Sequence, residues 1–308
     1  MEKQNLYIFN FSVFLLKTVI IVAVAGFSFS FAFEKSIIFN SQISGASKVN
    51  RILTKTIVDE VPIFGSSRAD GSYVPSIIFE KKSHNYGISG GQANIWLFFL
   101  EQELKKEKNT PILINFDLGG FNYSDGDIGN YIPNWNDTKD ILVEDGEFYF
   151  NVPFIKYFGK YESYFKLFIN EKFNLTKITD NGGSFEKNKL TKYNFDKLVE
   201  KRKNTVSSFT KNNRLLSKFN QLINTTNRTI ILVVSPYHSS YFNKFKNINE
   251  VDNYLSNLSK KNNIKVIDLR NFIKNDSLFL NTSHLNYDGA VKFSQKLKEE
   301  LKASKIEL

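Results

Sequence analysis

Short apolar segments alternate with longer segments of helical spacing along most of this chain, and this alternation most constrains its fold. The apolar segments have the composition of buried strands, and they are 61–64, 111–117, 229–235 and 264–269. The helices that the spacing predicts are 92–108, 155–173, 195–224, 249–262 and 287–302. Strands alternating with helices form a parallel sheet covered on both faces. We therefore predict an α/β protein, a three-layer α/β/α sandwich around a central parallel sheet, with a short second strand at Ile88.

The first part of the chain contains an almost wholly apolar run, Leu6–Phe33. About 20 apolar residues span a bilayer, so this run is long enough to cross one. Lys3 precedes the run and Lys17 interrupts it just before the segment Thr18–Phe33, and both favour a cytoplasmic N-terminus. A cleaved signal peptide is the alternative, because the small residues Ala23–Gly26 lie within the run. We predict a single-pass transmembrane helix that leaves the main domain outside the cytoplasm.

The domain organisation follows from these two features. Residues 1–50 are predicted to be the transmembrane anchor and a juxtamembrane segment, and residues 51–308 to be one α/β domain, since no repeat or Pro- and Gly-rich linker divides them. Residues 124–204 interrupt the strand and helix alternation and are rich in Tyr, Phe, Asn and Asp. We expect them to be an insertion at the strand ends, whose aromatic rings either contact a sugar or form a small core of their own.

Composition excludes several kinds of site. The chain has no cysteine and only three histidines, which rules out disulfides and thiolate metal sites and argues against a histidine-rich metal centre. The formal net charge is +10, but the lysines are scattered rather than clustered with aromatic residues as on a nucleic-acid surface. We therefore predict no metal, no cofactor and no nucleic acid. A biased base composition of the gene, or an anionic glycan or lipid partner, would each explain the positive charge.

Two polar stretches at opposite ends of the domain have the residue types of a hydrolytic site. Ile63–Asp70 runs from apolar residues into Gly-Ser-Ser-Arg, which places the Ser67 hydroxyl at a strand-to-helix turn. Thr282–Ala290 places His284 shortly before the last predicted helix. The two can meet because parallel strands bring their carboxyl ends to one edge of the sheet. An ordinary polar turn is the alternative interpretation of the serine stretch.

Together these stretches resemble the SGNH (GDSL-like) hydrolase family, in the branch where Gly-Ser-Ser-Arg stands for Gly-Asp-Ser. The resemblance runs from about Val61 to Leu301 and includes a second block, Asn85–Gly91. It implies that Ser67 is the nucleophile and His284 the base. Asn281 stands three residues before the histidine, where the family usually has aspartate, and the family's Gly-x-Asn-Asp block is missing.

The family pattern also implies roles for residues around this pair. The amides of Ser67 and Gly90, and the side chain of Asn122, take the places of oxyanion donors. Arg68 is placed either to hold an anionic substrate or to pair with Asp70. His238 follows a buried strand at the same edge and is placed either to touch substrate or to serve as a polar residue of the rim.

The resemblance implies metal-free acyl-ester chemistry outside the cytoplasm. The expected activity is that of an esterase or an O-acyltransferase acting on acyl groups, most plausibly acetyl, of a cell-surface or secreted polysaccharide. A multispanning membrane acyltransferase is the partner that such an anchored protein implies. Because Asn281 cannot supply the negative charge of an aspartate, an inactive scaffold or glycan-binding protein of a polysaccharide assembly is the alternative.

Overall fold

A central sheet of five parallel strands organises the domain. The computed structural model describes residues 2–79, 82–122, 157, 159–187, 189–304 and 306, with side chains from residue 10 onward. The sheet has the order β2-β1-β3-β8-β9. Its strands are β1 (Val61–Phe64), β2 (Ser83–Asn85), β3 (Ile112–Asn115), β8 (Ile230–Val234) and β9 (Ile264–Asp268). The predicted α/β class with a central parallel sheet is therefore confirmed.

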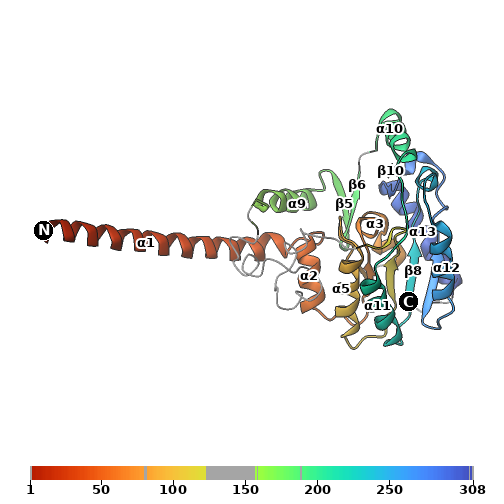
Figure 1. Ribbon diagram of the computed structural model, residues 1–308, viewed down its shortest axis with the longest axis horizontal. Helices are drawn as coiled ribbons and strands as arrows, with labels where there is room; N and C mark the ends of the chain where they lie inside the picture. The colour runs from red at the N-terminus through yellow and green to blue at the C-terminus, as the bar shows by residue number, and fades with distance from the viewer. Residues whose placement is uncertain are drawn as a thin grey trace.

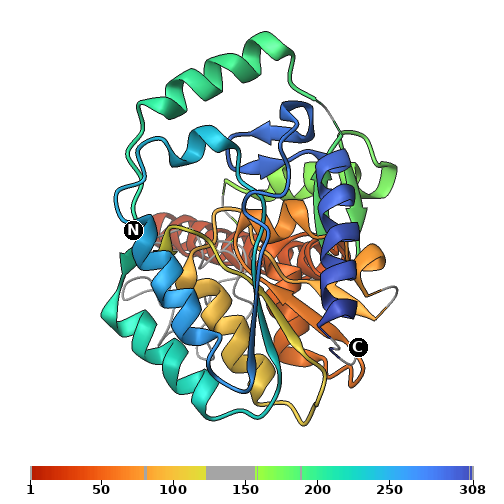
Figure 2. The same ribbon diagram turned by 90° about the vertical axis from the view of Figure 1, so that its right-hand side faces the viewer.

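The strands bury alternate side chains in two separate hydrophobic clusters, one on each face of the sheet. In β8, Ile230, Leu232 and Val234 join one cluster while Ile231 and Val233 join the other. Helices that pack in the first cluster are α2 (Gly45–Thr54), α5 (Ala93–Leu104), α11 (Asn213–Asn224) and α12 (Ile248–Leu258). Those in the second are α3 (Ser67–Ser72), α4 (Pro75–Ile78), α10 (Lys192–Lys203) and α13 (Tyr287–Ala303). Figure 2 shows α13 and α5 on opposite sides of the sheet.

Three predicted elements differ from the structure. Ile88 lies beyond β2, because its amide donates to Gly65 O (3.2 Å) in a loop rather than to a strand. The predicted helix over 195–224 is two helices, α10 and α11, since Asn212 accepts a hydrogen bond from Leu215 N (3.2 Å) and so begins a new helix. The juxtamembrane segment contains α2, which the mixed polar composition did not reveal; Ser44 caps it.

Smaller elements surround the sheet. A helix and a hairpin lie between 159 and 187, namely α9 (Tyr161–Phe173), β5 (Lys177–Asp180) and β6 (Gly183–Glu186). The other short strands are β4 (Gly120–Phe121), β7 (Thr210–Lys211), β10 (Phe279–Asn281) and β11 (His284–Leu285). Two 3-10 turns, η4 (Ser239–Phe242) and η5 (Asp276–Leu278), complete the described elements. Most of the first half of the predicted insertion over 124–204 lies outside the described residues.

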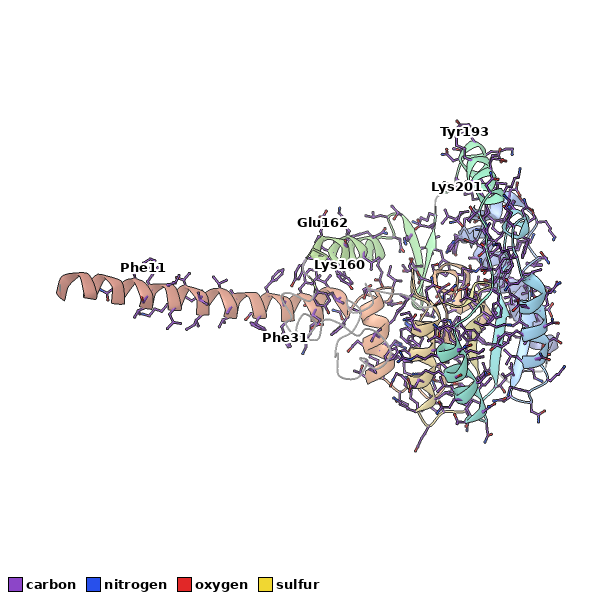
Figure 3. All side chains as sticks on the ribbon, in the orientation of Figure 1. Phe11, Phe31, Lys160, Glu162, Tyr193 and Lys201 are labelled. Carbon is purple, nitrogen blue, oxygen red and sulfur yellow. The ribbon has the colours of Figure 1, made fainter. Side chains whose placement is uncertain are left out.

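The N-terminal helix α1 (Glu2–Phe33) extends away from the domain and continues into a π-helical turn, η1 (Glu34–Ile38) (Figure 1). Within Asn10–Ile38, the most apolar 18-residue window has a mean hydropathy of 2.2, and the segment is long and apolar enough to cross a membrane. Side chains such as Phe11, 64% exposed, point away from the helix with no protein around them (Figure 3). This is consistent with a single membrane pass, and a signal sequence has the same properties.

The end of α1 is packed against the domain rather than joined to it by an extended linker. The ring of Tyr161, at the start of α9, lies 5.0 Å from the ring of Phe33, and its hydroxyl lies 2.9 Å from Ser30 Oγ. Figure 3 shows α9, marked by Lys160 and Glu162, beside this end of α1. Aromatic side chains gather here as they do at membrane interfaces.

The strand order determines where a site is expected. From β1 the chain first goes to β2 on one side and then to β3 on the other, so the direction of winding reverses at β1. In open α/β sheets, ligands bind outside the carboxyl ends of the strands at such a reversal. Ser67 follows directly from the carboxyl end of β1.

Candidate active site

The serine turn places the hydroxyl of Ser67 at the start of α3. Gly65 has φ +150°, and a Cβ there would lie 2.8 Å from Ala69 Cβ and 2.9 Å from Asn115 Cβ, so only glycine fits. Ser66 is the N-cap of α3, and its Oγ accepts a hydrogen bond from Arg68 N (3.2 Å). The two preceding residues thus make the turn and the cap, which leaves the Ser67 side chain free for other contacts.

His284 is held by the short hairpin of β10 and β11 just before α13. Asn281 pairs with His284 across this hairpin. Asn286 caps α13 by accepting from Gly289 N (3.1 Å), and its amide also donates to Ser277 O (2.7 Å). The segment that carries His284 is therefore fixed on one side by the pairing with Asn281 and on the other by the capped start of α13.

Ser67 and His284, which are 217 residues apart in the chain, meet at the rim of the sheet. Ser67 Oγ lies 2.8 Å from His284 Nε2. On the other side of the ring, Nδ1 lies 3.1 Å from Asn281 Oδ1. The backbone amides of Ser283 (2.9 Å) and His284 (3.0 Å) also donate to Asn281 Oδ1, which identifies this atom as the acceptor oxygen of the amide.

This arrangement selects one tautomer of the neutral imidazole. Asn281 Oδ1 can only accept, and Ser283 Oγ, also 3.1 Å from Nδ1, donates its own proton to that oxygen; this assigns the ring proton to Nδ1 and leaves Nε2 with a lone pair toward Ser67 Oγ. A histidine in this tautomer can take the hydroxyl proton when the serine attacks a carbonyl. The asparagine therefore orients the base, as an aspartate would, without adding a negative charge.

The electrostatic surroundings of His284 disfavour its charged form. Burial of the ring, together with the nearby Arg68 guanidinium, lowers the pKa of His284 to about 4. The imidazole is thus neutral at pH 7 and has the protonation state of a base. It is also a weaker base than an imidazole beside a carboxylate, since the contacts of the ring with described residues are with hydroxyls and an amide and not with a carboxylate.

Arg68 points into the protein rather than outward, and it is only 5% exposed. Its guanidinium donates to the carbonyl of Ser283 next to the base, and to Ser235 O (2.8 Å) and Ser235 Oγ (2.6 Å) at the end of β8. Its plane lies over the Tyr237 ring, 3.3 Å from the centroid. Arg68 therefore links the nucleophile helix to the histidine segment and to β8.

The carboxylate partner of Arg68 is Asp117, with Oδ1 3.1 Å from Nε, and not Asp70 as one sequence alternative had it. Asp70 pairs instead with Lys48. Sequence reasoning missed Asp117, Ser235 and Tyr237 as neighbours of the site. All three closely follow the carboxyl end of a buried strand, β3 or β8. This position can be recognised in the sequence and could have identified them.

The proposed oxyanion donors occupy different surroundings. Gly90 lies in an exposed turn closed by the bond from Gly91 N to Ile88 O (2.9 Å), and Ile88 is joined to Gly65 before the nucleophile. Asn122 uses its side-chain amide locally, donating to Gly119 O (3.2 Å). The oxyanion roles of the Ser67 amide, Gly90 and Asn122 stay predictions.

His238 forms a second, separate histidine site. Its Nε2 lies 3.1 Å from Asp276 Oδ1, and Ser240 N donates to its Nδ1 (3.2 Å). Its ring packs edge-on against Phe195 and Phe279. Its backbone amide donates to Thr282 O (3.1 Å), which supports the segment that carries His284. A direct contact of His238 with substrate stays a prediction.

Within the residues that the structure describes, no group of three or more His, Asp or Glu side chains is placed to hold a metal ion. The described side chains that meet beside Ser67 are its hydroxyl, the His284 imidazole and the Asn281 amide that orients it.

Comparisons with known proteins do not place the chain in a family. No family model matches the sequence, and no curated protein matches it. A solved structure with some likeness is "The structure of a putative platelet activating factor from Streptococcus pneumonia", with a TM-score of 0.43 and 12% sequence identity over 84% of this chain and 90% of that chain. A likeness of this size carries no argument about function, which therefore has to be argued from the site.

Proposed function

We propose that this protein is a membrane-anchored serine enzyme that hydrolyses or transfers acyl esters. The observation that carries the proposal is the chain of contacts Ser67 Oγ to His284 Nε2 (2.8 Å) and His284 Nδ1 to Asn281 Oδ1 (3.1 Å). A serine hydroxyl is a poor nucleophile until a neighbouring base takes its proton, and this geometry supplies that base.

In the proposed reaction, Ser67 Oγ attacks the ester carbonyl carbon as its proton passes to His284 Nε2. The tetrahedral oxyanion collapses, the carbon–oxygen bond of the ester breaks, and the leaving alcohol takes the proton from Nε2. A water or a second hydroxyl then loses its proton to Nε2 and attacks the carbonyl carbon of the acyl-serine. The bond from that carbon to Ser67 Oγ breaks, the acid or the new ester leaves, and Nε2 returns its proton to Ser67 Oγ. Hydrolysis and transfer differ only in the acceptor. Donors for the oxyanion, each worth about 10²–10³ in rate in such enzymes, are assigned to the Ser67 and Gly90 amides.

We further propose that the domain is a three-layer α/β/α sandwich of the SGNH type. Three features support this: helices pack on both faces of the sheet, the serine follows β1, and the histidine precedes the last helix. The proposed class also fits the position of the serine at the reversal of winding.

The substrate and location belong to the same proposal. We place the domain outside the cytoplasm, because α1 is apolar and long enough for one pass and both Lys3 and Lys17 lie before its longest uncharged part, Thr18–Phe33. The proposed substrate is an O-acyl group, acetyl in the simplest case, of a cell-surface or secreted polysaccharide. A multispanning membrane acyltransferase would supply the acyl group if the reaction is transfer.

One observation favours a second function, that of an inactive scaffold or glycan-binding protein. The pKa of His284 is lowered to about 4 and its orienting partner is an amide, so the base is weak. A protein that keeps the fold but binds an acylated glycan without turnover would tolerate this.

Labelling by a fluorophosphonate probe separates the two functions. In full-length protein in detergent we expect labelling at Ser67, abolished in Ser67→Ala and strongly reduced in His284→Ala. Ser66→Ala is the matched control, because Ser66 is the neighbouring hydroxyl and acts as a helix cap. Labelling at Ser66, or none in folded wild-type protein, would favour the scaffold.

Topology is tested separately. A reporter fused to the C-terminus is expected to be active only in an extracytoplasmic assay. Activity in the cytoplasm would contradict both the location and the polysaccharide substrate.

A further inference from the structure

Lys48 comes from the juxtamembrane helix α2 but is buried beneath the proposed active site. It is 1% exposed, and its ammonium donates to Asp70 Oδ1 (2.8 Å) and to Gly87 O (2.5 Å). Asp70 lies on α3 one turn after Ser67, and Gly87 begins the turn that reaches Gly90. A buried ammonium is retained only where it is paired and hydrogen-bonded, so these contacts fix the place of Lys48.

At this point the backbone of the Gly87 turn meets that of the segment from Gly65 to Asp70. A Cβ at Gly87 would lie 2.4 Å from Asp70 N, so the turn and the start of α3 are in direct backbone contact. One residue later, Ile88 N donates to Gly65 O (3.2 Å). Lys48 joins α2 to this contact through its side chain, because its ammonium holds both the carboxylate on α3 and the carbonyl of the turn. The relative position of Ser67 and the turn therefore depends on α2.

We infer that Lys48 is a positioning residue for acyl transfer, which fixes the Gly87–Gly90 turn relative to Ser67 from the membrane-proximal helix. The inference rests on the proposed function, since it concerns the oxyanion donor assigned to that turn. Displacing a reacting or stabilising group by about 1 Å costs roughly 10² in rate, and losing one oxyanion donor costs about 10²–10³. Loss of Lys48 is expected to lower the rate in the same way, by displacing the Gly87–Gly90 turn relative to Ser67.

The contact of Lys48 with Asp70 and Gly87 is also connected to the N-terminal helix α1. Ser44, the cap of α2, donates through its hydroxyl to Ile38 O (2.9 Å) at the end of η1, and Ser41 donates to Glu171 on α9 (2.6 Å). The last turn of the apolar helix, α2 and α9 are thus tied together. Lys48 extends this connection from the membrane-proximal end of the protein to the nucleophile helix.

The experiment removes the pair without leaving a buried charge. In full-length protein, Lys48→Met combined with Asp70→Asn takes away the ammonium, the ion pair and the bond to Gly87 O. We expect kcat for a small acetyl ester, and the rate of fluorophosphonate labelling at Ser67, to fall at least about tenfold. KM is expected to change less than about threefold, since the serine and the entrance to the site remain, and thermal unfolding is measured to show that the variant is folded.

Lys108 provides a matched control. Its side chain is as buried as that of Lys48, pairs with Glu103 Oε1 (2.8 Å) and donates to a backbone carbonyl, Glu60 O (2.9 Å). It lies at the opposite end of the strands, where Glu60 precedes β1. Lys108→Met combined with Glu103→Gln is expected to lower stability but to leave kcat within about threefold of wild type, because no reacting group is displaced.

Each result supports or overturns either the proposed function or the inference about Lys48. If folded wild-type protein is not labelled at Ser67, the proposed function is overturned and this inference falls with it. If wild type is labelled and the folded Lys48→Met/Asp70→Asn variant has a wild-type kcat, only the inference is overturned. If that variant does not fold, Lys48→Gln replaces it, because glutamine is too short to reach both Asp70 and Gly87. A tenfold lower kcat there supports the inference, and an unchanged kcat overturns it.

Discussion

Two histidines stand at the same rim of the sheet with opposite sets of partners. His284 has a serine hydroxyl on Nε2 and an asparagine oxygen on Nδ1, whereas His238 has a carboxylate, Asp276, on Nε2 and Ser240 on Nδ1. A Ser-His-Asp site would combine the serine of the first with a carboxylate like that of the second. Here Ser67 and the carboxylate are divided between two rings, and the hydroxyl beside His238 is that of the buried Ser240, 2.8 Å from Nδ1.

The difference separates orientation from charge. At His284 an amide oxygen fixes the tautomer and the ring plane, but the pKa falls to about 4 because burial and Arg68 both disfavour the imidazolium. At His238 a carboxylate is present on Nε2, but the hydroxyl on Nδ1 is that of Ser240, which lies two residues away in the same turn and is only 4% exposed. A carboxylate near a histidine is therefore a poor guide to the catalytic pair, and the position of the serine is a better one.

Removing each imidazole ring in turn is the strongest test that His284 and His238 have different roles. We expect His284→Gln to lower kcat/KM for an acetyl ester by about 10³ or more, since the serine loses its base. His238→Gln is expected to cost less than about tenfold, through the segment that it supports. Steady-state kinetics on both purified variants checks this. Equal losses would mean that the histidines share the chemistry, contrary to their geometry.

A carboxylate at residue 281 would test how much the missing negative charge beside His284 matters for the rate. Asn281→Asp keeps an acceptor toward Nδ1 and adds a carboxylate that stabilises the imidazolium formed during attack. In a serine protease the reverse exchange, aspartate to asparagine, costs about 10⁴ in rate, and the wrong tautomer accounts for a large share of that loss. Because the tautomer is already correct here, we expect a smaller gain, at least about tenfold in ester turnover, or roughly 1.4 kcal/mol of barrier. An unchanged rate in a folded variant would contradict the proposed Ser67–His284 pair.

The pH dependence of kcat/KM reports the same difference. Only neutral His284 can act as a base, so activity should be lost as pH falls through its pKa of about 4. A carboxylate at residue 281 favours the imidazolium and raises this pKa, which moves the acid limb to higher pH. We expect a shift of at least about one pH unit in Asn281→Asp. A limb that stays in place, or moves to lower pH, would show that another group controls the reaction.

Much of the fold could be predicted because it depends on local patterns. The apolar runs of β1, β3 and β8 were located within two residues at each end, as buried parallel strands are continuous in sequence. Helix α2 was missed because its few apolar residues form one face in a short polar stretch. The break between α10 and α11 was missed because it depends on the Asn212 cap and on pairing of β7 with the distant β4.

The site was predictable only where a residue type and its chemistry coincide. Ser67, His284 and Asn281 could be proposed from short motifs, and the structure brings them together. Arg68 was visible as a charge, but its burial and its partner Asp117 follow from the adjacency of β1 and β3. Lys48 gave no signal, because its place beneath α3 depends on how α2 packs after the whole sheet has formed.

The smallest effect is expected at Asp276, the carboxylate of the second histidine. Its side chain is 56% exposed, so its attraction to His238 is screened by water and is worth at most about 1 kcal/mol. Asp276→Asn keeps an oxygen that can accept from Nε2, and it leaves Phe195 and Phe279 around the ring. We therefore expect ester turnover within about threefold of wild type and a loss of unfolding free energy below about 1 kcal/mol, measured by urea titration. A larger fall in turnover than in His238→Gln would show that this carboxylate acts on the reaction directly, and the division of partners between the two histidines would then be wrong.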